Sequence, residues 1–494
     1  MSTAIESGAR IAGERSVTAD ACVIGTGAGG APVAALLAEA GMRVAILEEG
    51  ALHEPASMTA RPRDMMARLY RDGGQIATIG DPPIVLPLGR GIGGTTLVNS
   101  GTCFRTPQRV LDRWRADHGL ELDLDEEFAL VEEAIGVREV PPELAGRNAN
   151  LVKEGADRLG VSSGYLKRNA RGCIGSGVCA FGCPTGAKQH AGQVWIPRAQ
   201  DAGAMTFTDA KAQRIVVENG RVREVLARTA AGGTVRVRAE TVIVAAGALL
   251  TPLLLRRNGL GTGSGHLGRN LSIHPASAAR ALYDEVIDPW AGVPQSVYVD
   301  ELAADGIMLE GIAGPPDQGA MSTPRTGAAH RELMLAARRT GSFGVMVSDT
   351  ARGTVRSIGG RLVVRYDLHP GDAERFRRGF ELLAQIFFAA GAREVIVPVE
   401  GIPTLRDGDV EPLRRGRVRP RQISAMAFHP LGTARAGADP AASVVDPHLQ
   451  LHGVQGLYVA DGSVVPSSLG VNPQITIMAL AARLARDVSA SRRG

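Results

Sequence analysis

The chain lacks long apolar runs and lacks a recognisable secretory signal. Hydrophobic residues make up 44% of its 494 positions, and its mean hydropathy is near zero. The longest apolar stretches, such as Thr241-Val-Ile-Val-Ala-Ala, are far shorter than the about 20 residues that a membrane-spanning helix needs. Residues 1–10 show no basic segment followed by an apolar core and a cleavage site. We therefore expect a soluble protein with no transmembrane segment, located in the cytoplasm.

Lysine is scarce, and positive charge is not gathered into a stripe. The chain has four lysines, many arginines scattered among acids, and a formal net charge of only +4. Nucleic-acid binding usually requires a clustered basic face. The composition therefore argues against a nucleic-acid partner.

Cysteine is also scarce, with five residues. Cys173, Cys179 and Cys183 lie close together in Cys-Ile-Gly-Ser-Gly-Val-Cys-Ala-Phe-Gly-Cys-Pro, which resembles an iron–sulfur ligand run. Three thiolates could hold a three-iron cluster, but Cys22 and Cys103 belong to other motifs. Reduced structural thiols are our preferred interpretation, and we predict no metal site. A disulfide among the three, or a cluster, remains as an alternative.

The segment from Asp20 to Gly50 has a dinucleotide-binding pattern: strand, glycine turn, helix of small residues, second strand and a terminal acid. Gly25, Gly27 and Gly30 have the GxGxxG spacing, which permits a tight turn and close approach to a pyrophosphate. Glu48 follows about twenty residues later, where a carboxylate can accept hydrogen bonds from ribose hydroxyls.

Two later stretches favour FAD over NAD. Residues 88–101 form a second glycine-rich stretch whose backbone N–H groups could contact phosphate or a flavin ring. Residues 241–252 predict a buried strand that ends in small residues before a helix begins, so that backbone there can pass close to a flat ring.

Motifs along nearly the whole chain resemble the glucose-methanol-choline (GMC) family of FAD oxidoreductases. They are the turn ending at Gly30, residues 89–99, Gly268-Arg-Asn-Leu with His274-Pro275, His429-Pro-Leu-Gly-Thr, and residues 459–473. Gly-Arg-Gly-Ile-Gly-Gly and Gly-Val-Asn-Pro are similar to the cholesterol oxidase branch. Residues 347–394 and 182–189 are more similar to long-chain alcohol oxidases.

The resemblance implies an α/β fold (α+β overall), with a Rossmann-like FAD-binding domain and a substrate domain of a β-sheet plus helices. Both domains are expected to be discontinuous. The FAD-binding domain would comprise residues 15–105, 170–275 and 420–494, and the substrate domain residues 106–169 and 276–419. Within this frame, Asn219-Gly220 predicts a hairpin turn between two strands, and residues 372–390 predict an amphipathic helix that packs in a core.

The resemblance also implies a set of cofactor-binding residues. Val98 stands where some relatives carry a histidine joined covalently to FAD, so we expect non-covalent FAD. The residues expected to bind it are Gly25, Gly27, Ala28, Gly29, Gly30, Glu48, Glu49, Arg90, Gly93, Gly94, Thr95, Thr96, Asn99, Ser100, Gly101, Thr102, Ala212, Ala246, Asp461, Gly462, Asn472, Pro473, Gln474 and Ile475.

His429 and Asn472 are the strongest candidates for chemistry on an alcohol. A histidine suits proton removal because its ordinary pKa of about 6.5 is near working pH, and Phe428 and Pro430 give His429 apolar neighbours. Asn472 precedes Pro473 in a good helix start, which could be capping alone. The family match assigns His429 as base and Asn472 as the group that orients the substrate oxygen.

The substrate pocket is less well defined by sequence. Residues 282–350 contain apolar side chains consistent with a pocket lid: Trp290, Val293, Val297, Tyr298, Met308, Leu309, Phe343 and Met346. Glu310 is an acid in apolar surroundings, and it is either a catalytic residue near the substrate or the partner of an arginine.

Together these features predict an FAD-dependent alcohol oxidase or dehydrogenase for a hydrophobic primary or secondary alcohol, such as a fatty alcohol, sterol or terpenoid. O₂, a quinone or a protein would reoxidise the flavin. Two alternatives stay open: an isomerase, lyase or decarboxylase on the same scaffold, with Glu310 moving a proton, or a flavoprotein that delivers electrons to a partner.

Overall fold

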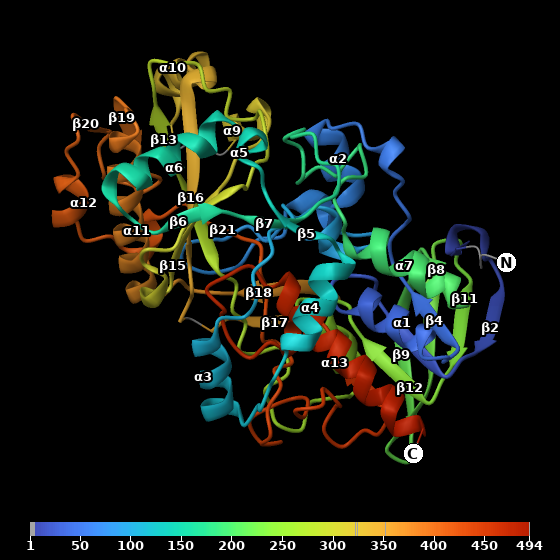
Figure 1. The fold of residues 1–494 in the computed structure, drawn as a ribbon. Helices are drawn as coiled ribbons and strands as arrows, with labels where there is room; N and C mark the ends of the chain where they lie inside the picture. The colour runs from blue at the N-terminus through green and yellow to red at the C-terminus, as the bar shows by residue number, and fades with distance from the viewer. Residues whose placement is uncertain (1–4, 322, 324, 351, 494) are drawn as a thin grey trace.

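The computed structural model describes residues 5–321, 323, 325–350 and 352–493. Two large sheets organise this part of the chain, one parallel and one antiparallel, at the lower right and upper left of Figure 1. Helices pack against both sheets. The fold is mixed α/β with a Rossmann-like sheet and a separate sheet-plus-helix region, which confirms the predicted fold class.

The parallel sheet brings together strands from the beginning, middle and end of the chain. Its order is β1–β8–β4–β3–β12–β22, and every neighbouring pair is parallel. Parallel sheets are covered on both faces, so their strands are continuous apolar runs. The strands are β1 (Glu6–Ser7), β8 (Met205–Thr208), β4 (Val44–Leu47), β3 (Ala21–Ile24), β12 (Thr241–Val244) and β22 (Leu457–Val459).

Helix α1 (Gly30–Glu39) follows the glycine turn as predicted and contacts β3 and β4. Its small residues are mostly buried because α7 (Ala191–Asp201) and α13 (Gln474–Arg493) pack against it. Figure 1 shows these helices beside the parallel sheet. The C-terminal helix is therefore part of the same layer as the N-terminal fingerprint.

A four-stranded sheet adjoins the parallel one, in the order β2–β11–β10–β9. The predicted hairpin is confirmed: Glu218 pairs with Arg221 across Asn219 and Gly220, whose φ angles are 49° and 73°. Two positive φ angles suit this two-residue turn. The strands are β2 (Glu14–Thr18), β11 (Thr234–Arg238), β10 (Arg221–Thr229) and β9 (Ala210–Glu218).

The antiparallel sheet has the order β20–β19–β13–β16–β15–β14–β6, with β21 paired to β13. One face packs on α11 (Pro370–Ala389), whose Phe376, Phe380, Leu383 and Ile386 are buried, as the predicted amphipathic helix requires. The strands are β20 (Leu405–Arg406), β19 (Glu394–Ile396), β13 (Pro275–Leu282), β16 (Thr340–Val347), β15 (Ile307–Gly311), β14 (Val297–Val299), β6 (Ser163–Tyr165) and β21 (Met426–Ala427).

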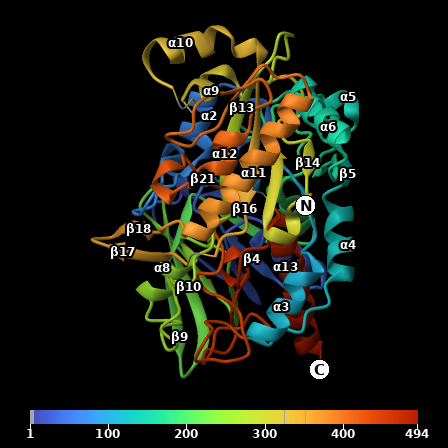
Figure 2. The ribbon, with the colours of Figure 1, turned by 90° about the vertical axis from the view of Figure 1, so that its left-hand side faces the viewer.

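The other elements surround these sheets. Figure 2 shows the two-stranded hairpin of β17 (Thr354–Ile358) and β18 (Arg361–Arg365) projecting from the body. The remaining elements are β5 (Val137–Glu139), β7 (Lys167–Asn169), α2 (Pro62–Leu69), α3 (Gln108–His118), α4 (Asp125–Ala134), α5 (Pro142–Ala145), α6 (Arg147–Leu159), α8 (Thr251–Arg257), α9 (Pro316–Met321), α10 (Gly327–Leu335) and α12 (Glu411–Arg415). Across the described residues, no helix has the length and apolar character needed to cross a membrane.

Candidate functional site

A cavity of about 1290 Å³ extends from the carboxyl ends of β3, β4 and β12 to the free face of the antiparallel sheet. Pockets for small molecules usually have volumes of roughly 300–1,000 Å³. The cavity is therefore large enough for a dinucleotide together with a second, smaller molecule.

Most of the residues predicted to bind the cofactor line this cavity. Three do not: Gly30, Gly93 and Ile475. The lining residues are Gly25, Gly27, Ala28, Gly29, Glu48, Glu49, Arg90, Gly94, Thr95, Thr96, Asn99, Ser100, Gly101, Thr102, Ala212, Ala246, Asp461, Gly462, Asn472, Pro473 and Gln474.

The three exceptions act through packing. A Cβ at Gly30 would lie 1.9 Å from the Gly25 carbonyl oxygen, so this glycine permits the close contact between the turn and α1. Gly93 has a φ of 104°, and a Cβ there would lie 2.6 Å from His190 Nδ1. Ile475 is fully buried in the first turn of α13.

Glu48, which the sequence predicts to bind a ribose, lies at the cavity wall. It follows β4 and is buried, and its Oε2 accepts hydrogen bonds from the N–H and hydroxyl of Thr26 (3.1 and 2.6 Å), while Oε1 accepts from Gly50 N–H (2.9 Å). Burial raises the pKa of this carboxyl. Oε1, which accepts only one of these hydrogen bonds, keeps a further lone pair for a hydroxyl donor in the cavity.

The cradle around the glycine turn fits a flavin dinucleotide. Gly27 and Gly94 face each other, because a Cβ at Gly94 would lie 2.9 Å from Gly27 Cα. Backbone from the first and second glycine-rich stretches thus meets at one place, where a pyrophosphate can approach N–H groups closely. Val98 is buried at the cavity wall and offers no nucleophilic atom for a covalent flavin bond.

A chain of amides connects the second glycine-rich stretch to the start of α13. Asn99 Nδ2 donates to Gln474 Oε1 (2.9 Å), and Gln474 Nε2 donates to the Thr102 carbonyl oxygen (2.7 Å). The Thr102 hydroxyl donates in turn to Gln295 Oε1 (2.6 Å). Residues 99–102 are therefore fixed against both the C-terminal helix and the loop that leads into β14.

The three predicted catalytic residues meet at the cavity wall. Asn472 Nδ2 lies 3.4 Å from His429 Nε2 and donates to Glu310 Oε2 at 3.3 Å. Gln295 Nε2 donates to the same Glu310 oxygen at 2.7 Å. His429 comes from the end of β21, Glu310 from β15 and Asn472 from the approach to α13, so three distant segments build the cluster.

The cluster contains polar atoms with no hydrogen-bond partner among the described residues. These are His429 Nδ1, Asn472 Oδ1 and Glu310 Oε1. Buried polar groups are rarely left unpaired. A cluster of such atoms at one end of a cavity is where a polar group of a ligand is expected to bind.

The environment of the cluster favours neutral side chains. Burial raises the pKa of Glu310 to about 7, and Asn472 offsets only part of that rise. His429 is half-buried and lines the cavity, and desolvation by its surroundings, together with neighbouring His274, lowers its pKa well below the ordinary value. At neutral pH, His429 is thus an unprotonated imidazole able to accept a proton.

His274 lies directly behind His429, with ring centroids 5.4 Å apart. Its Nε2 accepts hydrogen bonds from the N–H groups of Leu469 (2.8 Å) and Gly470 (3.0 Å), so the ring proton must be on Nδ1. Burial lowers its pKa to about 3. A neutral His274 therefore holds the segment that leads to Asn472.

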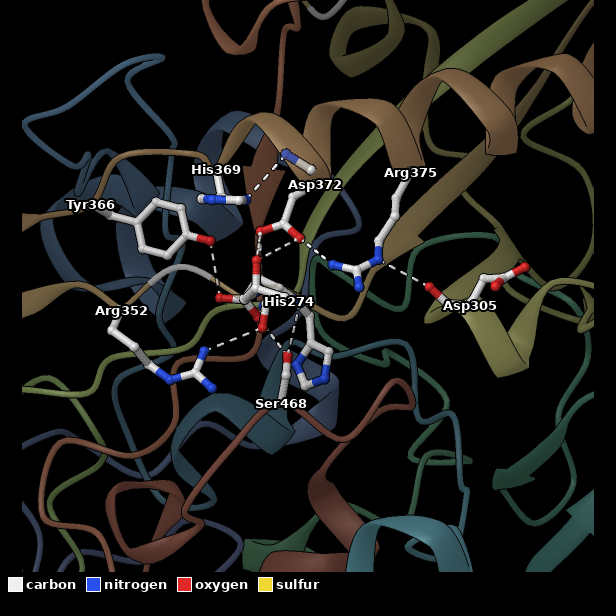
Figure 3. A network of polar contacts seen from close by, with 11 residues as sticks. His274, Asp305, Arg352, Tyr366, His369, Asp372, Arg375 and Ser468 are labelled. Atoms are coloured by element: carbon white, nitrogen blue, oxygen red, sulfur yellow. Dashed lines mark hydrogen bonds and ion pairs between the residues drawn. The ribbon is translucent and has the colours of Figure 1, made fainter. Parts of the chain in front are cut away.

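A buried network around Asp349 fixes the backbone of His274. Figure 3 shows three of the residues in this network, His274, Tyr366 and Ser468, close to one another. The Asp349 carboxylate accepts hydrogen bonds from Ile273 N–H (3.1 Å), His274 N–H (3.2 Å), Ser468 Oγ (2.5 Å) and the Tyr366 hydroxyl (2.9 Å). His274 has a φ of 47°, a left-handed conformation that is uncommon for a residue with a side chain. Sequence reasoning assigned no role to Asp349, because its partners are 17 to 119 residues away.

The antiparallel sheet supplies the far wall of the cavity. Strand alternation directs Ala276, Ala278 and Arg280 of β13, and Ser342 and Gly344 of β16, to the cavity side. Small residues next to Glu310 leave room for a bulky ligand. Arg280 is also in this wall, where burial lowers its pKa and its guanidinium donates to the Gly319 carbonyl oxygen of α9 at 2.9 Å.

The predicted pocket lid is only partly correct. Trp290 and Met346 line the cavity. Val297, Leu309 and Phe343 are fully buried in the core on the α11 side instead, because alternate residues of a strand point to opposite faces. The apolar composition of residues 282–350 did not distinguish the cavity face of the sheet from the face that packs on α11.

Asn472 does not use its side-chain oxygen as a helix cap. Helix α13 begins at Gln474, and the Asn472 amide donates into the cluster while its Oδ1 has no partner among the described residues. The capping interpretation of this residue is therefore wrong.

The five cysteines are free thiols. Among the described residues, no group of three or more His, Cys, Asp or Glu side chains has an arrangement that could hold a metal ion. The structure thus contains neither the disulfide nor the cluster geometry that the cysteine spacing left open.

Comparisons with known proteins agree with this architecture. GMC oxidoreductase family models match residues 66–276 and 349–481. A GMC-type oxidoreductase of Mycobacterium tuberculosis, itself uncharacterised, is 44% identical over 95% of this chain and 76% of its own. A long-chain-alcohol oxidase of Arabidopsis thaliana is 28% identical over 94% of this chain and 66% of its own.

A solved structure shows the same fold. Pyridoxine 4-oxidase from Mesorbium loti superposes with a TM-score of 0.73 at 22% identity, over 95% of this chain and 98% of its own. Taken with the matching family models and the 44% identical relative, the chain belongs to the GMC oxidoreductase family, whose members are FAD-dependent enzymes acting on CH–OH groups.

Proposed function

We propose that the protein oxidises a hydrophobic primary or secondary alcohol to a carbonyl compound, with His429 as the base. The observation that supports this proposal is the cluster of His429, Asn472 and Glu310 at the cavity wall, in which each side chain has a buried polar atom with no partner among the described residues. A fatty alcohol, sterol or terpenoid is the proposed substrate class. The name of the plant relative, a long-chain-alcohol oxidase, supports the same class.

The residues of this chain would bind and deprotonate the alcohol. Its oxygen would accept a hydrogen bond from Asn472 Nδ2, and its hydroxyl proton would pass to His429 Nε2, since both atoms point to one place 3.4 Å apart. His429 is neutral before the reaction because its pKa is lowered. FAD, bound without a covalent link, supplies the acceptor for the carbon-bound hydride.

The cavity supports a substrate with an extended apolar body. Ala276, Ala278 and Gly344 are small residues on the wall beside the cluster, and Trp290 and Met346 add apolar surface. Binding such a body in a dry cavity is favoured by about 25 cal/mol per Å² of apolar surface buried. Oxygen, a quinone or a protein is proposed as the final electron acceptor.

Removal of the base tests the proposal. We expect His429→Ala to keep bound FAD but to slow flavin reduction by an alcohol about 10²–10⁴-fold, as loss of a general base usually does. The measurement is bleaching of flavin absorbance after anaerobic mixing with a series of alcohols. A variant that reduces its flavin within a few-fold of the unmodified protein would show that His429 is not the base.

Proton transfer between carbons is a second candidate function, favoured by Glu310. Its carboxyl has a pKa near 7, faces the cavity and has an unpaired Oε1 within the described residues, so it can both accept and donate a proton. Product formation from an unsaturated substrate without net flavin bleaching would identify an isomerase. Loss of that product in Glu310→Gln, with flavin reduction retained, would assign the step to this carboxyl.

A further inference from the structure

Two cations are buried beneath the second glycine-rich stretch, away from the catalytic cluster. Arg168 and Lys188 are 3% and 2% exposed. Within the described residues, neither forms an ion pair with a carboxylate: Lys188 Nζ donates to the carbonyl oxygens of Leu97, Asn99 and Cys179, each at 2.8 Å. Burying two positive charges without an anion is costly.

Thiols are the groups beside these cations that can become anions. Arg168 donates to Cys179 Sγ at 3.1 Å, and its other hydrogen bonds go to the Ser100 carbonyl oxygen. Cys183 Sγ accepts from Lys188 backbone N–H at 3.4 Å and lies 3.5 Å from the Thr185 hydroxyl. A thiolate at Cys183 would be stabilised by the Lys188 ammonium and by the nearby N–H and O–H donors, whereas Arg168 is beside Cys179.

The titration behaviour of these groups is consistent with mutual stabilisation. Burial lowers the pKa of Lys188 to about 8, and nearby cysteines oppose that decrease. Burial would raise the pKa of Cys183, but hydrogen bonds from Thr185 and Lys188 outweigh it and the net pKa is lowered. Cys179 is buried, whereas Cys183 is partly exposed and can meet a reagent from solution.

We propose that Cys183 is a reactive thiolate and a site of modification by hydroperoxides and other soft electrophiles. In the peroxide reaction, the thiolate sulfur attacks one peroxide oxygen, the O–O bond breaks and hydroxide leaves. The sulfur is oxidised by two electrons to a sulfenic acid while the peroxide is reduced. The site is separate from the catalytic cluster and does not depend on the proposed substrate.

Lys188 connects this site to the flavin-binding stretch. One ammonium group holds both the carbonyl of Cys179, in the cysteine segment, and the carbonyls of Leu97 and Asn99. Loss of the thiolate charge at Cys183 removes an anion that offsets Lys188. Modification is therefore expected to weaken the anchoring of residues 97–99 and, with it, FAD binding.

The primary experiment compares the alkylation of Cys183 and Cys173 by iodoacetamide in the holoenzyme, followed by peptide mass spectrometry. Cys173 is the matched control, because it is also half-buried and lies in the same segment. We expect Cys183 to react at least tenfold faster at pH 7 and to lose little rate between pH 8.5 and 7. A rate for Cys183 that is no higher than that of Cys173 at pH 7, or that falls tenfold per pH unit, would overturn the proposal.

A surface variant provides a second measurement that does not endanger folding. Thr185 is exposed, and Thr185→Val removes its hydroxyl next to Cys183 Sγ, so alkylation at pH 7 should slow several-fold. Thr185→Ser keeps the hydroxyl and should retain the rate. Equal rates in both variants would show that the hydroxyl does not stabilise a thiolate.

Peroxide treatment tests the modification and its connection to the flavin. We expect a dimedone adduct at Cys183 after exposure to hydrogen peroxide, together with an increased Kd for FAD, and neither effect in Cys183→Ser. An unchanged Kd after complete modification would refute the connection through Lys188. Iron and acid-labile sulfide in the purified protein would overturn the whole proposal, because the thiolates would then be cluster ligands.

Discussion

At the scale of single residues, the Glu310 carboxyl combines burial with incomplete hydrogen bonding. Oε2 accepts hydrogen bonds from Gln295 and Asn472, whereas Oε1 has no partner among the described residues. The sequence predicted an acid in apolar surroundings, but it left open a pairing with an arginine. The structure places amides there instead, and amides neutralise no charge.

This environment predicts a pH-dependent stability difference for Glu310→Gln. The pKa rises from 4.5 in the unfolded chain to about 7 in the folded protein. The folded state therefore favours the protonated carboxyl, and this contribution to stability is present below pH 4.5 and lost as pH rises through 7. Glutamine does not ionise, so at pH 8 the variant should be more stable than the unmodified protein, by about 3 kcal/mol at most.

Thermal unfolding of the two holoproteins at pH 5 and pH 8 measures this effect. The difference in Tm in favour of Glu310→Gln should be clearly larger at pH 8 than at pH 5. An equal difference at both pH values would show that Glu310 titrates at its ordinary pKa.

At the scale of elements, four hydrogen bonds to Asp349 connect three segments that are far apart in the sequence. They fix the backbone of Ile273 and His274, the hydroxyl of Ser468 and the ring of Tyr366. His274 then accepts from the N–H groups of Leu469 and Gly470, close before Asn472. The position of Asn472, the proposed substrate-orienting amide, thus depends on a carboxylate that does not line the cavity.

We expect Asp349→Asn to slow flavin reduction and to lower Tm by a few degrees. An amide offers one acceptor oxygen where the carboxylate offers two, so a buried donor is left unpaired at a cost of about 1–3 kcal/mol. Stopped-flow reduction and thermal unfolding measure the two effects. Tyr366→Phe removes only one of the four hydrogen bonds and should have a smaller effect on both, and the reverse order would contradict this assignment.

Local sequence patterns predicted where turns and helices form more accurately than they predicted which side chains of a strand are buried. The GxGxxG turn, the Asn219-Gly220 hairpin and the helix after Pro370 all form where the local pattern placed them. Turn conformation and helix periodicity depend on residues close in sequence. The lid residues Leu309 and Phe343 were misplaced, because which face of a strand is buried depends on the neighbouring sheet and helix.

At the scale of the whole molecule, one large cavity separates the parallel sheet from the antiparallel sheet. It is lined by residues from both the N-terminal fingerprint and the C-terminal helix start. The proposed division into an FAD-binding domain of residues 15–105, 170–275 and 420–494 and a substrate domain of residues 106–169 and 276–419 stays a prediction. Whatever the domain division, a cofactor bound in this cavity would contact segments from the beginning, middle and end of the chain.

FAD should therefore stabilise the entire protein. A ligand that binds only the folded state adds about 4 kcal/mol at a free concentration 1,000 times its Kd, so the apoprotein should show a lower Tm that rises as FAD is added. Differential scanning calorimetry measures the shift. FMN lacks the adenosine half that Glu48 is predicted to bind, so it should raise Tm much less than FAD does. An equal rise with FMN would contradict the predicted role of Glu48.

The sequence by itself determined the family, the glycine turns and the identities of His429, Asn472 and Glu310 as candidates, because such motifs reflect local backbone requirements and residue chemistry. Only the tertiary structure decided that these three side chains meet, since they come from β21, the approach to α13 and β15. It also decided that Asn472 faces the cavity instead of capping its helix, and that Lys188 and Arg168 lie beside thiols. Contacts between distant segments depend on packing of the whole chain, which no local pattern records.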